Sequence, residues 1–134
     1  MDRLFVDTSA WYAFLNRHDP NHSAVADVLA EWEGRLLLTD YVFDELVTLI
    51  RARVGHELAV RAGSALRSGD LALLVAVEPK DIENAWQRFC RDSDKAYSFT
   101  DCCSFAVMTR LRLSQAAACD AHFRQAGFHS LPPR

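Results

Sequence analysis

The sequence contains neither paired cysteines nor a long hydrophobic run, and both absences narrow the class of protein. None of its four cysteines forms a C-x-x-C pair, and two are adjacent, which is a poor geometry for a mutual disulfide. The first apolar run follows only three residues and is too short for a signal peptide or a membrane span. We therefore expect a reduced, cytoplasmic protein with no membrane partner. The cysteines are Cys90, Cys102, Cys103 and Cys119.

Excess positive charge and grouped zinc ligands are also missing. The formal net charge is −3, so nucleic-acid binding would need a local basic patch beside an acidic site. This argues against a generic DNA-binding protein. His18 and His22 have helical i,i+4 spacing, but Pro20 lies between them and argues against a zinc-binding helix face.

No internal repeat, low-complexity segment or linker divides the chain. Half of the 134 residues are hydrophobic, enough for one compact core and too few for two, so we expect one domain over residues 1–134. Short apolar runs alternate with helical patterns, which predicts a three-layer α/β domain with a mostly parallel central sheet between helices. Strands are predicted over 4–6, 35–39, 71–77, 115–119 and 128–131, and helices over 10–15, 22–32, 41–54, 57–66, 81–91, from about 99 and around 123.

The stretch Leu4 to Trp11 (LFVDTSAW) is the most informative, because an apolar run ends there on an acid and two hydroxyls. Asp7 should lie at the carboxyl end of a strand, where ligands bind in open α/β sheets. Taken alone, Asp7 is more simply explained as the N-cap of the following helix. Only other acids converging on Asp7 would give it a functional role.

Glu45 is the second acid of interest. At 100° per residue it falls just beyond the Leu49 edge of the apolar arc of the helix over 41–54, so it should border the core. The simpler alternative is a solvated charge on the flank of the helix. Arg53 falls inside the same apolar arc, where packing does not explain a charged side chain.

Two further acids lie near the C-terminal end of the sequence. Asp101 falls in the first turn of a helix that Ser98 or Thr100 can cap, and it shares a face with Phe105, so its carboxylate should be partly buried. The alternative is an Asp that only complements the helix dipole. Asp120 ends a weak strand as Asp7 ends the first, so the two acids should lie on the same sheet edge.

Four carboxylates in one crevice would repel each other unless a cation lay between them. Oxygen ligands select Mg²⁺ or Mn²⁺ over zinc, and such ions activate water and hold phosphate oxygens. The acids therefore suggest a metal-dependent phosphodiesterase. They are Asp7, Glu45, Asp101 and Asp120.

The order of these acids resembles the PIN-domain nucleases, especially the VapC-like toxins of bacterial toxin–antitoxin pairs. The resemblance spans almost the whole chain and is carried by VDTSA around Asp7, DEL around Glu45, YSFTDCCSF around Asp101 and CDAHFRQAGF around Asp120. It implies a PIN-like fold and a Mg²⁺- or Mn²⁺-dependent endoribonuclease with an RNA substrate. It also implies a cognate antitoxin and a homodimer, for which the helices over 42–66 offer apolar surface.

The resemblance also implies roles for individual residues. Asp7 and Asp101 would be the firmest metal ligands, Glu45 and Asp120 would complete the acidic cluster, and Ser9 and Thr100 would orient them. One departure is Ala118-Cys119 before Asp120, where the family more often has a Thr with an apolar residue. Four basic residues can reach RNA phosphates, although exposed surface charges are the simpler interpretation. They are Arg17, Arg51, Lys95 and Arg124.

Two other classes of protein compete with this interpretation. A haloacid-dehalogenase-like phosphatase also places an Asp after the first strand but needs a second acid two residues later, where this chain has Ser9. No P-loop is present either. A non-catalytic PIN-like module that binds RNA or protein predicts a broken acidic set, whereas all four acids are present.

Overall fold

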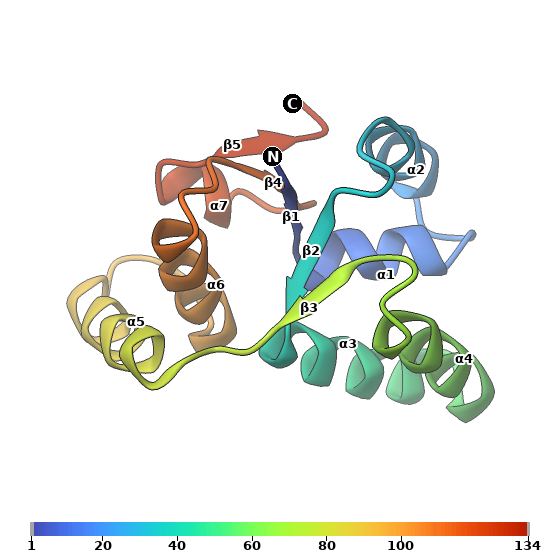
Figure 1. Ribbon diagram of the computed structural model, residues 1–134, viewed down its shortest axis with the longest axis horizontal. Coiled ribbons are helices and arrows are strands. Elements are labelled where there is room, and N and C mark those ends of the chain that lie inside the picture. The colour runs from blue at the N-terminus through green and yellow to red at the C-terminus, as the bar shows by residue number, and fades with distance from the viewer. Residues whose placement is uncertain (1, 134) are drawn as a thin grey trace.

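The computed structural model describes residues 2–133, in which five strands form a single sheet of order β3-β2-β1-β4-β5 (Figure 1). Every pairing of neighbouring strands is parallel, as predicted. The elements are β1 (Leu4–Val6), α1 (Thr8–Leu15), α2 (His22–Glu31), β2 (Leu36–Thr39), α3 (Asp40–Arg53), α4 (His56–Arg67), β3 (Leu73–Val75), α5 (Pro79–Arg91), α6 (Phe99–Arg110), β4 (Gln115–Ala117), α7 (His122–Gln125) and β5 (His129–Leu131).

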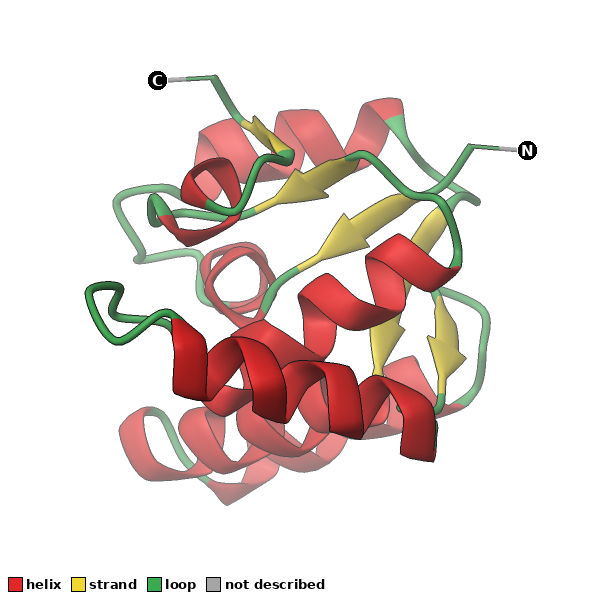
Figure 2. Ribbon diagram, turned by 90° about the vertical axis from the view of Figure 1, so that its left-hand side faces the viewer, coloured by secondary structure: helices red, strands yellow, loops and turns green. Residues whose placement is uncertain are grey.

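Helices lie on both sides of the sheet, which confirms the predicted three-layer α/β architecture. In Figure 1, α5, α6 and α7 lie to the left of the strands, whereas α1, α2 and α4 lie to the right and α3 runs along the lower edge. Figure 2 shows the strands in yellow between the helices in red. Parallel strands need such crossovers because a tight turn cannot join them.

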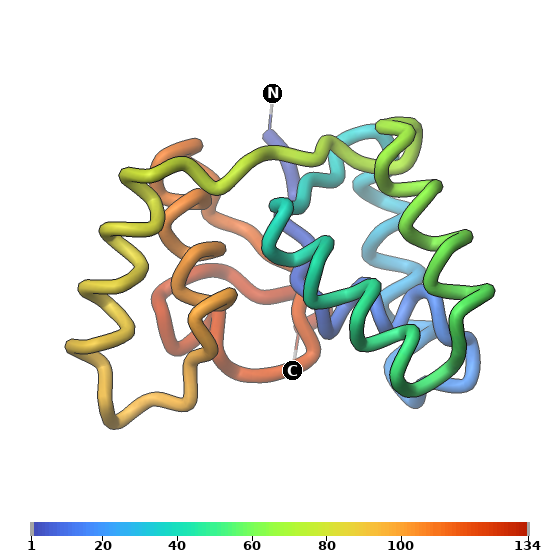
Figure 3. Tube along the Cα trace, turned by 90° about the horizontal axis from the view of Figure 1, so that it is seen from below, coloured from blue at the N-terminus to red at the C-terminus, as the bar shows by residue number. Residues whose placement is uncertain are grey.

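The two helical layers follow from the strand order. The chain moves outward from β1 through β2 to β3 and then returns to pair β4 with the other side of β1. Figure 3 shows the yellow-green segment after α4 crossing the molecule to reach α5. Because right-handed crossovers in opposite directions cover opposite faces, this return places α5 and α6 across the sheet from α1 to α4.

β1 lies at the centre of the sheet and of the core. Leu4, Phe5 and Val6 are fully buried. Phe5 pairs in register with Ala116 of β4, and its ring lies 5.9 Å from that of Phe123. The carboxyl ends of β1 and β4 are therefore adjacent, so residues that follow these strands open onto one edge of the sheet.

The prediction that residues 71–77 form a strand buried on both faces is wrong. The strand is limited to Leu73–Val75 at the edge of the sheet, where Leu73 is 44% and Leu74 is 37% exposed. A continuous apolar run is typical of a buried parallel strand, but it carries no information about how many neighbours the strand has. Within residues 2–133, β3 pairs only with β2.

Two hydrogen bonds at the start of α3 fix the position of the helix. Thr39 rather than Asp40 is the N-cap, because the Thr39 hydroxyl accepts a hydrogen bond of 3.1 Å from the Val42 backbone N–H. Asp40 instead accepts a bond from the Val77 backbone N–H at 2.9 Å and thereby ties the helix to the segment after β3. None of the helices within residues 2–133 has the length and apolar character needed to cross a membrane.

Candidate active site

A cavity of about 400 Å³ opens at the carboxyl edge of the central strands. Its wall combines the residue after β1, one face of α3, the first turn of α6 and the loop after β4. All four acids predicted from the sequence line this cavity: Asp7, Glu45, Asp101 and Asp120. The structure therefore brings together residues that are far apart in the chain.

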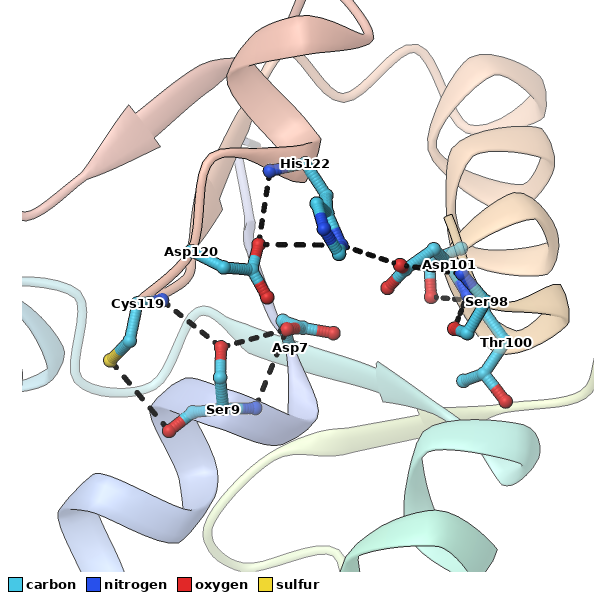
Figure 4. Close-up of polar contacts among 9 residues, drawn as sticks. Asp7, Ser9, Ser98, Thr100, Asp101, Cys119, Asp120 and His122 are labelled. Carbon is cyan, nitrogen blue, oxygen red and sulfur yellow. Dashed lines mark hydrogen bonds and ion pairs between the residues drawn. The ribbon is translucent and has the colours of Figure 1, made fainter. Parts of the chain in front are cut away.

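Asp7 is buried and is held by its neighbour Ser9 (Figure 4). Asp7 Oδ2 accepts hydrogen bonds from the Ser9 hydroxyl at 2.8 Å and from the Ser9 backbone N–H at 3.4 Å. The Ser9 hydroxyl in turn accepts a bond of 3.0 Å from the Cys119 backbone N–H. Asp7 is thus the N-cap of α1 and also lines the cavity. A capping role and a functional role for this residue therefore do not exclude each other.

The second carboxylate oxygen of Asp7 has no donor. Asp7 Oδ1 is buried and accepts no hydrogen bond from any residue in the described range 2–133. Burial, and then the negative charge of Asp101, raise the pKa of Asp7 to about 7, against the hydrogen bond from Ser9. A buried oxygen without a donor is costly, and a cation would satisfy it while also neutralising the carboxylate.

Asp101 is fixed by the first turn of α6. Its backbone N–H donates to the Ser98 hydroxyl at 2.9 Å, and its Oδ2 accepts from the Ser98 backbone N–H at 3.0 Å, which together form a capping box. Ser98 is therefore the cap. The side chain of Thr100 makes no hydrogen bond within residues 2–133, so the expected orienting contact from Thr100 is replaced by one from Ser98.

His122 lies between two of the acids and was missed by the sequence analysis. Its Nδ1 is 2.8 Å from Asp101 Oδ2 and 3.8 Å from Asp120 Oδ1, and its backbone N–H donates to Asp120 Oδ1 at 3.0 Å (Figure 4). Burial raises the pKa of Asp101, while the bonds from Ser98 and His122 act in the opposite direction. The signal in the sequence was the D-x-H spacing of Asp120 and His122, which lets both the backbone N–H and the ring of His122 approach the Asp120 carboxylate.

Glu45 lines the cavity from α3 but stands apart from the other acids. It is half-buried, as its place at the border of the apolar arc predicted. It makes no hydrogen bond or ion pair with any described residue. The cavity therefore has Asp7 held by Ser9, Asp101 and Asp120 joined through His122, and Glu45 on a separate wall.

The residues that line the cavity suit a hydrated divalent cation. Among residues 2–133, no three Asp, Glu, His or Cys side chains lie close enough to enclose an ion as they stand. Mg²⁺, however, keeps several of its waters and binds proteins through one or two carboxylates. The oxygen donors, the unpartnered Asp7 Oδ1 and the raised pKa of Asp7 fit such an ion better than a closed cage of ligands.

An acid-lined cavity at the carboxyl edge of a parallel α/β sheet is the arrangement expected of a metal-dependent phosphodiesterase. Comparison with known proteins narrows this class. The model of the PIN domain matches residues 4–129, and the chain belongs to the PIN-domain family.

Relatives in this family cover nearly the whole chain. VapC20 of Mycobacterium tuberculosis, named a 23S rRNA-specific endonuclease, is 35% identical over 130 residues, which are 97% of this chain and 98% of VapC20. Ribonuclease VapC26 of the same organism is 31% identical over 111 residues, which are 81% of this chain and 80% of VapC26.

The solved structures agree with the sequence relatives. The crystal structure of VapC20, described as a sarcin-ricin loop cleaving toxin, matches with a TM-score of 0.88 at 34% identity and covers 93% of this chain and 95% of that one. FitAcB from Neisseria gonorrhoeae matches with a TM-score of 0.71 at 16% identity, over 95% of each chain, and therefore shares the fold alone.

Proposed function

We propose that this protein is a divalent-metal-dependent endoribonuclease and the toxin of a VapBC-type toxin–antitoxin pair. The observation that carries the proposal is the acid-lined cavity in which Asp7 has a buried oxygen without a donor and a pKa of about 7. The names of VapC20 and VapC26, an endonuclease and a ribonuclease, support RNA as the substrate. We also propose that residues 1–134 act as a single nuclease domain.

The four acids would have different roles at the metal site. Asp7 and Asp101 would be the main ligands of Mg²⁺ or Mn²⁺, with Glu45 and Asp120 completing the negative cluster. When bound, the cation would supply positive charge for the phosphate oxygens and would lower the pKa of water.

Neighbouring residues orient these carboxylates for the cation through hydrogen bonds. The Ser9 hydroxyl fixes Asp7 Oδ2 and leaves Oδ1 for a ligand. Ser98 and His122 hold Asp101 from two sides, as partners of metal ligands commonly do.

The test is cleavage of a fluorescently labelled single-stranded RNA by the purified protein. Mg²⁺ or Mn²⁺ should stimulate cleavage, EDTA should abolish it, and excess cation should restore it. The double variant Asp7→Asn, Asp101→Asn, purified in the same way, controls for contaminating nuclease. Once contaminating nuclease has been excluded, cleavage that persists in this variant without metal would remove the mechanism.

Although the complete set of four acids in the cavity favours the nuclease, the second candidate is a non-catalytic PIN-like module that binds RNA or protein. It predicts that the protein binds the same RNA in Mg²⁺ without shortening it. Product length on a denaturing gel separates the two functions.

The toxin assignment implies a protein partner and a second copy of the chain. An antitoxin segment would cover the cavity by placing an Arg or Lys beside the carboxylates. The α3–α4 pair carries exposed apolar side chains, with Val54 49% and Val60 51% exposed, and would supply the surface for a homodimer in the cytoplasm. A monomer in sedimentation at micromolar concentration would count against the dimer.

A further inference from the structure

Arg53 is the one arginine or lysine among the described residues that line the acidic cavity. It is the residue whose place in the apolar arc of α3 had no packing explanation. The same wall carries Glu45 and Leu49, so the three side chains follow at intervals of four residues along one face of the helix. Arg53 therefore lies about 12 Å along the helix axis from Glu45.

Arg53 does not neutralise the acids around it. Within residues 2–133 it forms no ion pair, although five carboxylate side chains line the same cavity. Its guanidinium carbon instead lies 5.7 Å from the centre of the Tyr12 ring, within the range of a cation–π contact. Asn16 lies 3.4 Å from the Tyr12 hydroxyl and donates to it, which anchors that end of the ring.

This arrangement leaves the charge and the donors of Arg53 available to a ligand. A planar guanidinium presents a fork of N–H groups that matches phosphate oxygens, and stacking on an aromatic ring orients that fork. Because the net charge is −3 and the cavity is acidic, an RNA strand needs a local cation to approach it. Arg53 is exposed and can make such a contact.

We propose that Arg53, held on the Tyr12 ring, binds a backbone phosphate of the RNA next to the phosphate at the acids. The contact orients the strand along α3 and does not depend on the base sequence, since it reads only the backbone. Arg53 is thus a positioning residue. This inference rests on the proposed RNA cleavage.

The experiment measures KM, kcat and the salt dependence of kcat/KM for single-stranded RNA oligonucleotides of two different sequences at saturating Mg²⁺. Arg53→Ala should raise KM about tenfold for both sequences and leave kcat within about twofold. The slope of log kcat/KM against log salt should become less steep by about 0.7, the value for one lost phosphate contact on a single strand. Arg53→Lys should retain the slope and raise KM less.

Arg61→Ala is the matched control, because Arg61 is an exposed arginine on α4 that does not line the cavity and its loss changes the net charge equally. It should leave KM and the slope unchanged. Tyr12→Phe should behave as the wild type, whereas Tyr12→Leu should raise KM because the guanidinium loses its ring.

Two results would overturn the inference. One is an unchanged KM and salt slope in Arg53→Ala, and the other is a loss of kcat alone, which would place Arg53 at the reacting phosphate. Absence of metal-stimulated cleavage by the wild-type protein is a different result and would overturn the proposed function itself.

Discussion

His122 Nδ1 lies 2.8 Å from Asp101 Oδ2, which joins the start of α7 to the first turn of α6. The carboxylate accepts, so Nδ1 carries the proton and donates. Asp101 Oδ2 is thus held by the His122 ring and by the Ser98 backbone N–H together. The orientation of this buried acid is set within the protein itself.

Replacing His122 should weaken metal binding. His122→Ala removes a donor that orients Asp101, and the loss of such a partner typically costs about tenfold or more in metal affinity. The Mg²⁺ concentration for half-maximal RNA cleavage should rise by about that factor, and saturating Mg²⁺ should restore most of the rate. His129→Ala, at an exposed position of β5, is the control. Equal half-saturation in both variants would contradict the role.

Neutralising Asp7 should stabilise the metal-free protein at alkaline pH. The folded pKa of about 7 lies above the ordinary value of 3.8, so folded Asp7 keeps its proton between these values while the unfolded chain loses it. The stability of the wild type should therefore fall as pH rises through this window. In EDTA, Asp7→Asn should be more stable than the wild type at pH 8 by about 1 to 4 kcal/mol, and less so at pH 5.

Urea unfolding at both pH values measures the Asp7 effect. Asn retains the capping ability of Asp, so the substitution does not remove the helix cap. Asp44→Asn, which neutralises an exposed acid on α3, controls for the change in net charge. A destabilised Asp7→Asn variant at pH 8 would show that the burial and repulsion of the Asp7 charge do not dominate at this site.

Asp101→Asn separates a metal-site acid from one that only complements a helix dipole. Loss of a helix-dipole contact would destabilise the protein by about 0.3 to 1 kcal/mol. Because burial raises the pKa of Asp101, we expect the opposite sign in EDTA, a gain on the order of 1 kcal/mol. Saturating Mg²⁺ should then raise the Tm of the wild type more than that of the variant. Equal Mg²⁺ shifts in thermal unfolding would count against Asp101 as a ligand.

The ion pair between the buried Asp81 and the exposed Arg110 lies away from the cavity, and we expect it to affect stability but not RNA cleavage. Asp81 is 1% exposed, and its carboxylate accepts from Arg110 Nε at 3.0 Å and from Arg110 Nη2 at 2.9 Å. Burial acts to raise the pKa of Asp81, but the bonds and charge of Arg110 and the bond from the Glu78 backbone N–H together lower it. The pair therefore stabilises the fold above the ordinary pKa and less as pH falls.

The substitution Arg110→Met would leave the Asp81 charge buried without its partner. It should cost about 3 kcal/mol in urea unfolding at pH 7, and the double variant Asp81→Asn, Arg110→Met should recover part of this loss. RNA cleavage should stay near the wild-type rate at temperatures where the variant is folded. A neutral effect of Arg110→Met on stability would be the contrary result.

Local patterns determined the layers of the fold and the acids of the site. An apolar run that ends on Asp7 indicates the end of a buried strand, and the shared helix face of Asp101 and Phe105 indicates a buried carboxylate. Both features follow from spacing within a few residues, because the periodicity of strands and helices determines which way each side chain points. Asp7 and Asp120 each follow a strand, and parallel strands end together, so the sequence also indicated that these two acids share one sheet edge.

Tertiary packing decided what neighbouring residues could not. An apolar run reports hydrophobicity but not strand order, so the exposure of β3 depends on the return of the chain to β4. The contacts of His122 with Asp101 and of Arg53 with Tyr12 join segments brought together only by the crossovers of the sheet. Each pair needs a backbone that is already folded before its side chains can meet, and no local spacing specifies that.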